Sequence, residues 1–196
     1  GIQSSHKTAA NAYTAQSNAG VGWLGAHTGY TTTAANACAA CHRSHTAHDS
    51  ARLLKGQTDQ VCFQCHDGNP LTALRDVQSE FSRKMFVHPS LGAQAGHDPN
   101  EAPDSIVSRH AACDDCHDPH AARARTTTIQ PPQLSTALYG ASGIASGGTP
   151  LDPHRGTGEA GNEYEICFKC HSYNPNQPQG GGGFQTYGPQ PVRQLL

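Results

Sequence analysis

Apolar residues recur at helical spacing in only one long stretch of this chain. Over residues 71–86, apolar side chains stand three or four positions apart, at Leu71, Leu74, Val77, Phe81 and Met85. This spacing predicts an amphipathic helix whose apolar stripe faces a core. On this pattern we expect Met85 to be a core residue. Because Pro89 disfavours helical geometry at the residue before it, the chain should leave the helix by His88.

The rest of the chain shows no sustained helical or strand period. Residues 1–37 are small and polar, and residues 121–161 are rich in Thr, Pro and Gly, which is typical of a surface loop. Residues 176–196 are rich in Gln, Pro and Gly, a composition that favours disorder unless packing or a partner orders the segment. Residues 98–104 form an acidic turn cluster, either a solvated loop or a calcium site. We therefore expect mostly irregular coil, with a few short α-helices and little or no sheet.

Composition indicates a thin side-chain core. Only 35% of the 196 residues are hydrophobic and 6% are aromatic, whereas there are 21 glycines and 13 prolines. Side chains of this kind would struggle to offset the conformational entropy lost on folding. Something larger than leucine or valine should therefore fill the interior.

Cysteine and histidine follow one repeated pattern that supplies such a group. Cys-x-x-Cys-His occurs at residues 38–42, 62–66, 113–117 and 167–171, here called the first to fourth motifs, and uses all eight cysteines. This run is the attachment signature of c-type haem. The thiols add to the haem vinyl groups and the adjacent histidine ligates the iron. The expected thioether residues are Cys38, Cys41, Cys62, Cys65, Cys113, Cys116, Cys167 and Cys170, and the expected proximal ligands are His42, His66, His117 and His171.

Two other kinds of site use the same cysteine spacing. Cys-x-x-Cys is also found in thioredoxin-type redox pairs and in zinc knuckles. The twenty residues between the first two cysteine pairs also fit a four-cysteine zinc ribbon. Neither site needs a histidine directly after the second cysteine, yet all four motifs have one. The pattern therefore favours four covalently attached haem c groups, each with its iron.

The count of histidines predicts the second iron ligand. The chain has 13 histidines but a single methionine, so nine histidines remain for four distal positions. Bis-histidine ligation is therefore expected throughout, and the absence of His/Met ligation indicates comparatively low reduction potentials.

Spacing selects four distal candidates among these nine histidines. His45 and His120 each follow a proximal histidine by three residues, so in a short helix they share its face and can reach a neighbouring iron. For the other two positions we choose His27, upstream of the first motif, and His88, which the bend at Pro89 presents from an apolar stretch. The remaining candidates are His6, His48, His97, His110 and His154.

The motifs form an internal repeat. A Cys-x-x-Cys-His-x-x-His opening occurs at residues 38–45 and again 75 residues later, whereas the Cys-Phe-x-Cys-His endings lie 105 residues apart. The second module thus contains thirty additional residues. The predicted organisation is an N-terminal arm (1–37), a first two-haem module (38–70), a helix and connecting loop (71–112), a second two-haem module (113–175) with a loop insert near 121–161, and a Gly/Pro-rich tail (176–196).

The net charge argues against a nucleic-acid partner, and the hydropathy argues against a transmembrane segment. The formal net charge is −2, and haem propionates would make the loaded protein more negative, so we expect no nucleic-acid partner. No apolar run is long enough for a transmembrane segment. Because covalent haem attachment takes place outside the cytoplasmic membrane, we expect a removed secretion signal. The protein should therefore be extracellular, at the cell surface, or alternatively periplasmic.

Three stretches resemble bacterial multihaem cytochromes with doubled CXXCH motifs: residues 38–47, 113–120 and 163–171. Four haems in about two hundred residues, preceded by a long arm, are similar to the tetrahaem subunits of extracellular cytochrome filaments of the outer-membrane cytochrome E type. The resemblance implies electron transfer along a head-to-tail homopolymer, from a redox donor to an extracellular acceptor. In that family a histidine of one subunit can complete a haem of the next, and the resemblance does not say which histidine does so here.

Three functions follow from these observations. The first is electron transfer through closely packed haems in a conductive filament, or nanowire, and the second is a soluble periplasmic tetrahaem shuttle. The third is a multihaem reductase, which needs an open iron coordination site beside a positioned base or an Arg/Lys cluster. Nine spare histidines argue against an open iron, and no such cluster is evident. We expect an electron carrier, not an enzyme.

Overall fold

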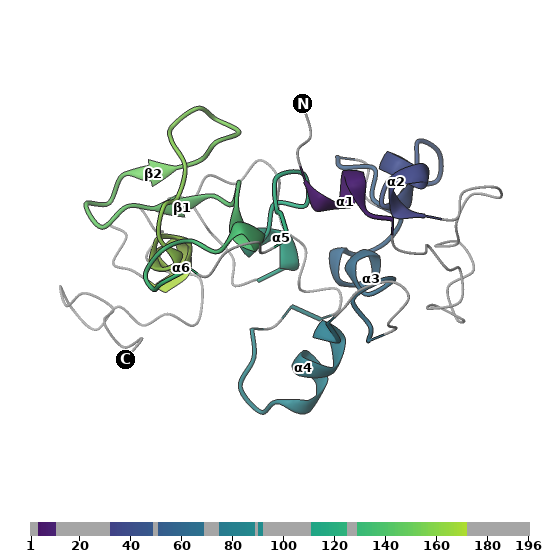
Figure 1. The fold of residues 1–196 in the computed structure, drawn as a ribbon, viewed down its shortest axis with the longest axis horizontal. Coiled ribbons are helices and arrows are strands. Elements are labelled where there is room, and N and C mark those ends of the chain that lie inside the picture. The colour runs from purple at the N-terminus through teal and green to yellow at the C-terminus, as the bar shows by residue number, and fades with distance from the viewer. Residues whose placement is uncertain are drawn as a thin grey trace. The chain divides into compact units, whose positions relative to one another are not determined.

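A computed structural model describes residues 4–10, 32–48, 51–68, 75–88, 90–91, 111–124 and 129–171. The chain divides into two compact units. The first unit comprises Gly1–Pro99 and His110–Cys113, and the second comprises Asn100–Arg109 and Asp114–Leu196. Within the described ranges the chain is mostly coil with short helices and one two-stranded sheet (Figure 1), which confirms the predicted fold class.

The secondary-structure elements of the described residues are short. In chain order they are α1 (Ser5–Thr8), α2 (Thr33–Asn36), the 3₁₀ helix η1 (Ala37–Ala40), α3 (Thr58–Cys62), α4 (Val77–Arg83), α5 (Cys113–Cys116), the 3₁₀ helix η2 (Thr136–Leu138), β1 (Gly143–Ile144), β2 (Pro150–Leu151) and α6 (Glu163–His171). In the part of the chain that the structure describes, no helix has the length and apolar character needed to cross a membrane.

In the first unit, residues 4–10 lie against α2. The amide of Ala34 donates to the carbonyl of Ala9 at 2.9 Å. Ser4, which precedes α1, is only 3% exposed. This part of the predicted arm therefore packs on its own chain.

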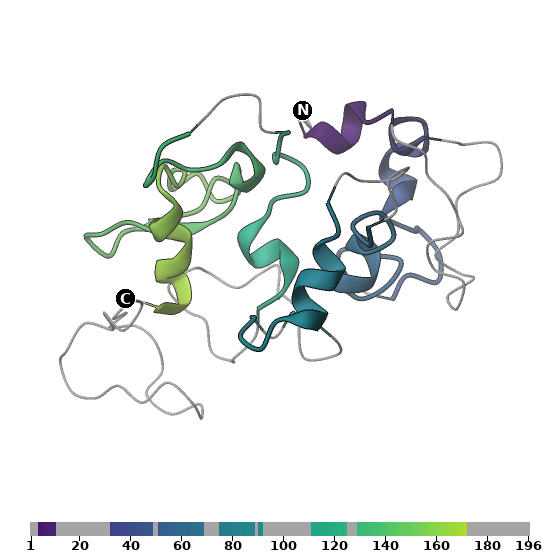
Figure 2. The ribbon, with the colours of Figure 1, turned by 60° about the horizontal axis from the view of Figure 1, so that its bottom comes forward.

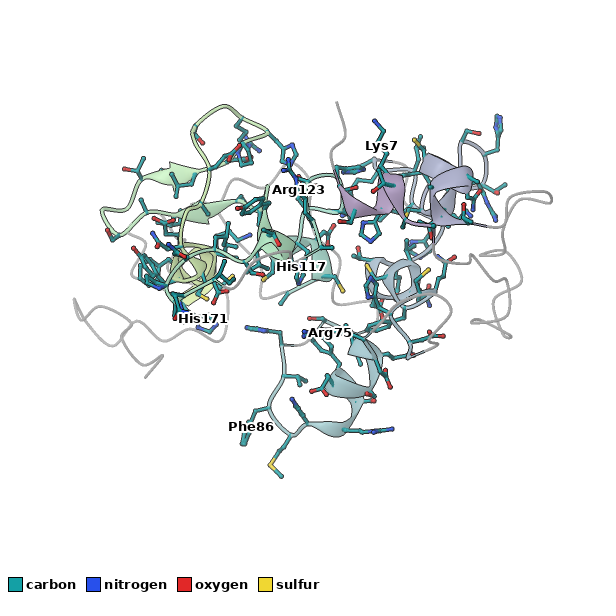
Figure 3. The ribbon with its side chains drawn as sticks, viewed as in Figure 1. Lys7, Arg75, Phe86, His117, Arg123 and His171 are labelled. Atoms are coloured by element: carbon teal, nitrogen blue, oxygen red, sulfur yellow. The ribbon has the colours of Figure 1, made fainter. Side chains whose placement is uncertain are left out.

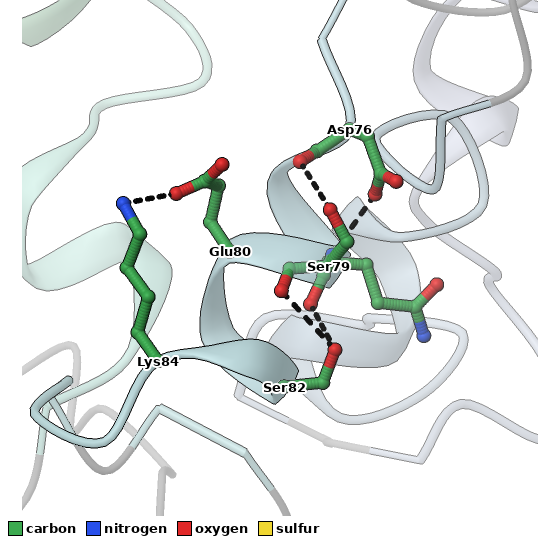
Figure 4. Close-up of polar contacts among 6 residues, drawn as sticks. Asp76, Ser79, Glu80, Ser82 and Lys84 are labelled. Carbon is green, nitrogen blue, oxygen red and sulfur yellow. Dashed lines mark hydrogen bonds and ion pairs between the residues drawn. The ribbon is translucent and has the colours of Figure 1, made fainter.

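Helix α4 is shorter than the helix predicted over residues 71–86. It begins at Val77 because the Asp76 carboxylate accepts a hydrogen bond from the Ser79 amide at 2.9 Å (Figure 4), a side-chain cap for the helix N-terminus. The amides of Val77 and Gln78 donate to the carbonyl of His66, which joins α4 to the second motif. Residues 71–74 lie outside the described residues.

The prediction that Met85 belongs to the core is wrong. Lys84 adopts an extended conformation and ends α4, so Met85 leaves the helical stripe and is 87% exposed. The neighbouring Phe86 is 89% exposed and projects from the segment after α4 (Figure 3).

The second unit has a small core built around α6. Strands β1 and β2 pair antiparallel, with Gly143 opposite Leu151, and α6 lies alongside this hairpin in both views (Figures 1 and 2). A side chain at Gly143 would place its Cβ 2.9 Å from the Glu165 carbonyl oxygen, so glycine is what permits this close approach of strand and helix. The core cluster consists of Leu134, Ala141, Ala160 and Ile166.

The insert at residues 121–161 contributes more than the surface loop expected from its composition. It contains the hairpin and η2, and it supplies three of the four core residues just named. Two of these are alanines, which composition alone does not mark as core. The insert thus covers α6, which contains the fourth motif.

Candidate haem-attachment sites

Each of the four motifs folds into a turn of helix. In the first motif the amides of Cys41 and His42 donate to the carbonyl of Cys38, at 3.2 and 2.9 Å. The second motif makes the same two bonds to the carbonyl of Cys62, at 3.2 and 3.1 Å. The first four residues of the third motif form α5, and the fourth motif forms the C-terminal part of α6. Because residues three apart lie on one face of a helical turn, both thiols of a motif can meet the two vinyl groups of one ring.

Two proximal histidines are oriented by main-chain carbonyls. Nδ1 of His42 lies 2.8 Å from the oxygen of Arg52, and Nδ1 of His117 (Figure 3) lies 2.9 Å from the oxygen of Ala137. A carbonyl can only accept, so Nδ1 must be the protonated nitrogen and Nε2 the one with an available lone pair. This arrangement is usual for histidines that bind metals, and it suits ligation of iron through Nε2.

The carbonyl that orients each of these histidines comes from a segment outside its motif. Residues 51–55 fold back on the first motif, with the Arg43 amide donating to the Leu53 carbonyl and the Lys55 amide donating to the Cys41 carbonyl. Ala137 belongs to η2, within the insert of the second module. The insert that lengthens the second module therefore supplies the hydrogen-bond acceptor for the proximal His117.

In the first unit the thiols of the first and second motifs lie close enough to influence one another. Burial raises the pKa of the Cys65 thiol to about 11, and the neighbouring Cys41 and Asp67 add to the shift. Burial also raises the pKa of Cys41, against the opposing charge of Lys55. Haems attached to these two motifs would consequently be neighbours.

In the second unit a buried lysine joins the third and fourth motifs. Lys169 stands between the two cysteines of the fourth motif and is only 4% exposed. Its Nζ donates to the main-chain oxygen of Asp115, which stands between the cysteines of the third motif, and to Oγ of Ser142 at 3.1 Å. The sequence offered no signal for this contact, because lysine in that position is ordinarily solvent-exposed.

His120, one of the predicted distal ligands, has a buried carboxylate beside its ring. Asp118 Oδ1 accepts from the His120 amide at 2.7 Å and lies 3.5 Å from its Nδ1, while Oδ2 lies 3.2 Å from Nε2 of His154. Burial raises the pKa of Asp118, but the hydrogen bonds from His120 and the charge of His154 outweigh it and hold that pKa below its usual range. The pKa of His120 is raised, chiefly by its hydrogen bond to Asp118.

The remaining distal candidates differ in where they lie. His45, His48 and His88 are exposed. The ring of His6, on α1, lies beside that of the proximal His66. The last three candidates, His27, His97 and His110, lie outside the described residues, as does the acidic cluster at residues 98–104.

A cationic cavity lies next to the first motif. Arg43, Thr46, His48 and Lys55 line a volume of about 370 Å³. Lys55 is only 1% exposed, and burial lowers its pKa, with a further contribution from Arg43. Cationic side chains in this position suit the propionates of a haem attached to the first motif.

The described residues do not gather into a separate metal-binding cluster. Among them, no three His, Cys, Asp or Glu side chains converge on a point that could hold a metal ion.

Comparison with known protein families gives one match. Residues 31–70, which contain the first and second motifs, match the family model of the doubled CXXCH motif. The match supports a multihaem c-type cytochrome with covalently bound haem c. No curated protein and no solved structure matches the chain.

Proposed function

We propose that the protein transfers electrons through four bis-histidine haem c groups, one on each motif. The doubled CXXCH match supports multihaem electron transfer for residues 31–70. The observation that carries the extension to the third motif is that His117 makes the same kind of hydrogen bond as His42, and the fourth motif has the same Cys-x-x-Cys-His sequence. Each of these two residues is the proximal histidine that opens a module, and each donates from Nδ1 to a main-chain carbonyl.

Bound haem iron would supply one-electron chemistry, and the chain's own residues would bind, orient and space the groups. The cysteines of each turn would hold one ring, and the carbonyls of Arg52 and Ala137 orient two proximal imidazoles. Lys169 and Asp115 hold the third and fourth motifs together, and Cys41 of the first motif lies near Cys65 of the second. Electron tunnelling falls steeply with distance, so attachment sites held in adjacent pairs favour rapid exchange within each pair.

We further propose that the protein is a carrier and not an enzyme. Histidines outnumber the distal positions, so every iron can be closed on both faces. Pyridine haemochrome analysis of the matured protein should give four c-type haems per chain. Low-temperature electron paramagnetic resonance (EPR) should show low-spin ferric signals only. A high-spin signal from one haem in four would instead support the reductase, because it would reveal an open coordination site.

The setting that we propose is an extracellular filament built head to tail. The resemblance to tetrahaem filament subunits supports this proposal, as does the surplus of histidines, which allows one ligand to be donated between subunits. A heterologous contact that does not close into a ring propagates as a helical polymer. His27 is the donor candidate in this scheme, since it belongs to the predicted arm.

A periplasmic tetrahaem shuttle is the second candidate, and one observation favours it. Residues 4–10 pack on α2 of their own chain, as the arm of a monomer would. Negative-stain microscopy of the native secreted protein separates the two settings. In the filament, His27→Ala should yield monomers with one high-spin haem, whereas wild-type protein that is monomeric at all concentrations would establish the shuttle.

A further inference from the structure

The rings of His6 and His66 lie at about the separation that two ligands of one iron would have. Their centroids are 6.3 Å apart and their planes cross at 84°. His66 is the proximal histidine of the second motif, whereas His6 comes from α1, sixty residues earlier in the chain. Both residues belong to the first unit.

The separation of the rings can be compared with the space that an iron requires. A bond from a metal to an imidazole nitrogen is about 2 Å long, and that nitrogen lies roughly 1 Å from the ring centre. Two imidazoles on opposite faces of one iron therefore have centroids about 6 Å apart. The observed distance agrees with this value, and the crossed planes are one of the two limiting arrangements of a bis-imidazole haem.

We propose that His6 is the distal ligand of the haem attached to the second motif, opposite His66. This inference rests on the proposed function, because it assigns one of the four distal positions. His6 then takes a position for which spacing favoured His27 or His88. One of those two histidines becomes available for another role.

The backbone on each side of the pair is held by contacts between protein groups. Next to His6, the packing of Ser4 and the bond from the Ala34 amide to the Ala9 carbonyl hold α1 against α2. On the other side, the His66 amide donates to the Cys62 carbonyl, and the His66 carbonyl accepts from the first amides of α4. These backbone contacts therefore constrain the gap between the two imidazoles.

Edge-to-face packing of two imidazoles is the competing explanation. Aromatic pairs pack with centroids 4.5–7 Å apart, so the distance alone does not separate the two. The competing explanation predicts no change in ligation at any iron when His6 is replaced, because the His6 ring would then not be an iron ligand. Iron spectroscopy distinguishes them directly.

The spectrum of the wild-type protein provides the first test. Crossed imidazole planes give a ferric haem a highly anisotropic low-spin EPR signal with a large gmax, whereas nearly parallel planes give a rhombic signal. The matured protein should contain one such large-gmax component attributable to the second motif. We expect this component in the spectrum of the wild-type protein, and we expect the His6→Ala variant described next to lack it.

The second test uses His6→Ala in the matured holoprotein, with Lys7→Ala as a matched control on the same exposed turn of α1. His6→Ala should keep all four covalent haems, lose the large-gmax component and place one of the four haems in a high-spin state. Added imidazole should restore the low-spin state. Lys7→Ala should match wild type. His6→Met should keep the haem low-spin but raise the midpoint potential of one haem, since His/Met ligation raises it.

The outcomes separate this inference from the function on which it rests. A wild-type chain without four covalent haems by pyridine haemochrome and mass spectrometry would contradict the tetrahaem function itself. Four haems in His6→Ala, with an EPR spectrum unchanged from wild type, would overturn the assignment of His6 alone and leave ring packing as the explanation.

Discussion

Replacing Lys169 by methionine should destabilise the second unit, because this buried side chain bonds the third motif to the fourth. Methionine keeps a similar unbranched stem and volume, so the change removes the amino group with little disturbance of packing. The amino group donates two hydrogen bonds, to the Asp115 carbonyl and to the Ser142 hydroxyl. The variant therefore tests polar contacts between motifs and not the apolar core.

The expected loss can be worked from these two bonds. Each contributes about 1 kcal/mol net, and a buried acceptor that loses its donor costs about 1–3 kcal/mol. The free energy of unfolding should therefore fall by about 2–3 kcal/mol. For a chain of this size, 1 kcal/mol shifts Tm by about 2–4 °C, so Tm should fall by roughly 5–10 °C.

Thermal unfolding of the matured protein, followed by Soret circular dichroism, measures this change. Lys84→Met is the matched control, since Lys84 is exposed and pairs with the exposed Glu80 one turn away (Figure 4). A surface pair of this kind contributes about 0–1 kcal/mol. If Lys169→Met lowers Tm by no more than Lys84→Met does, the contact between the motifs does not stabilise the protein and the reasoning is refuted.

Three other changes test separate parts of the structure. If His120 is a distal ligand, as proposed, Asp118→Asn removes the carboxylate beside it and the midpoint potential of one haem should rise in a spectroelectrochemical titration. Asp152→Asn, an equally buried control, should leave all potentials unchanged. Hydrogen bonds from the Ser79 amide and hydroxyl group lower the pKa of Asp76 below its ordinary 3.8. Protection of the α4 amides in hydrogen exchange should therefore persist above pH 3.8, decline as the pH falls through the lower folded value, and be reduced at every pH in Asp76→Ala. Chain made without haem attachment should show no cooperative unfolding transition, because its buried apolar cluster is small; a folded apoprotein would show that side chains alone suffice.

The bounds of helix α4 show what the spacing of apolar residues can predict and what it cannot. The apolar spacing over residues 71–86 located a helix but overestimated its length, because the boundary depends on single contacts. The Asp76 carboxylate and the His66 carbonyl take up the first amides, so the helix starts at Val77. Beyond Arg83 the backbone becomes extended, and Met85 projects away from the core that its spacing indicated. The spacing of apolar residues indicates which side chains would share one face of a helix, whereas capping and tertiary contacts determine where the helix begins and ends.

The sequence by itself determined the chemistry that is local. Two cysteines and a histidine within five residues are enough to indicate a haem-attachment site, because all the groups involved lie in one short stretch of the chain. The scarcity of apolar residues likewise predicted a fold of coil and short helices. Neither conclusion requires knowledge of the path of the chain between motifs.

Only the tertiary structure decided which distant groups meet. His6 faces His66, Lys169 bonds to Asp115 fifty-four residues away, and the insert brings the Ala137 carbonyl to His117. Nine spare histidines have nearly the same local chemistry, so spacing could rank them only by proximity along the chain. The proposed choice of His6 as an iron ligand instead depends on backbone contacts such as those that hold α1 on α2. Those contacts form between segments that are distant in the chain, and neither segment's sequence indicates which other segment it will contact.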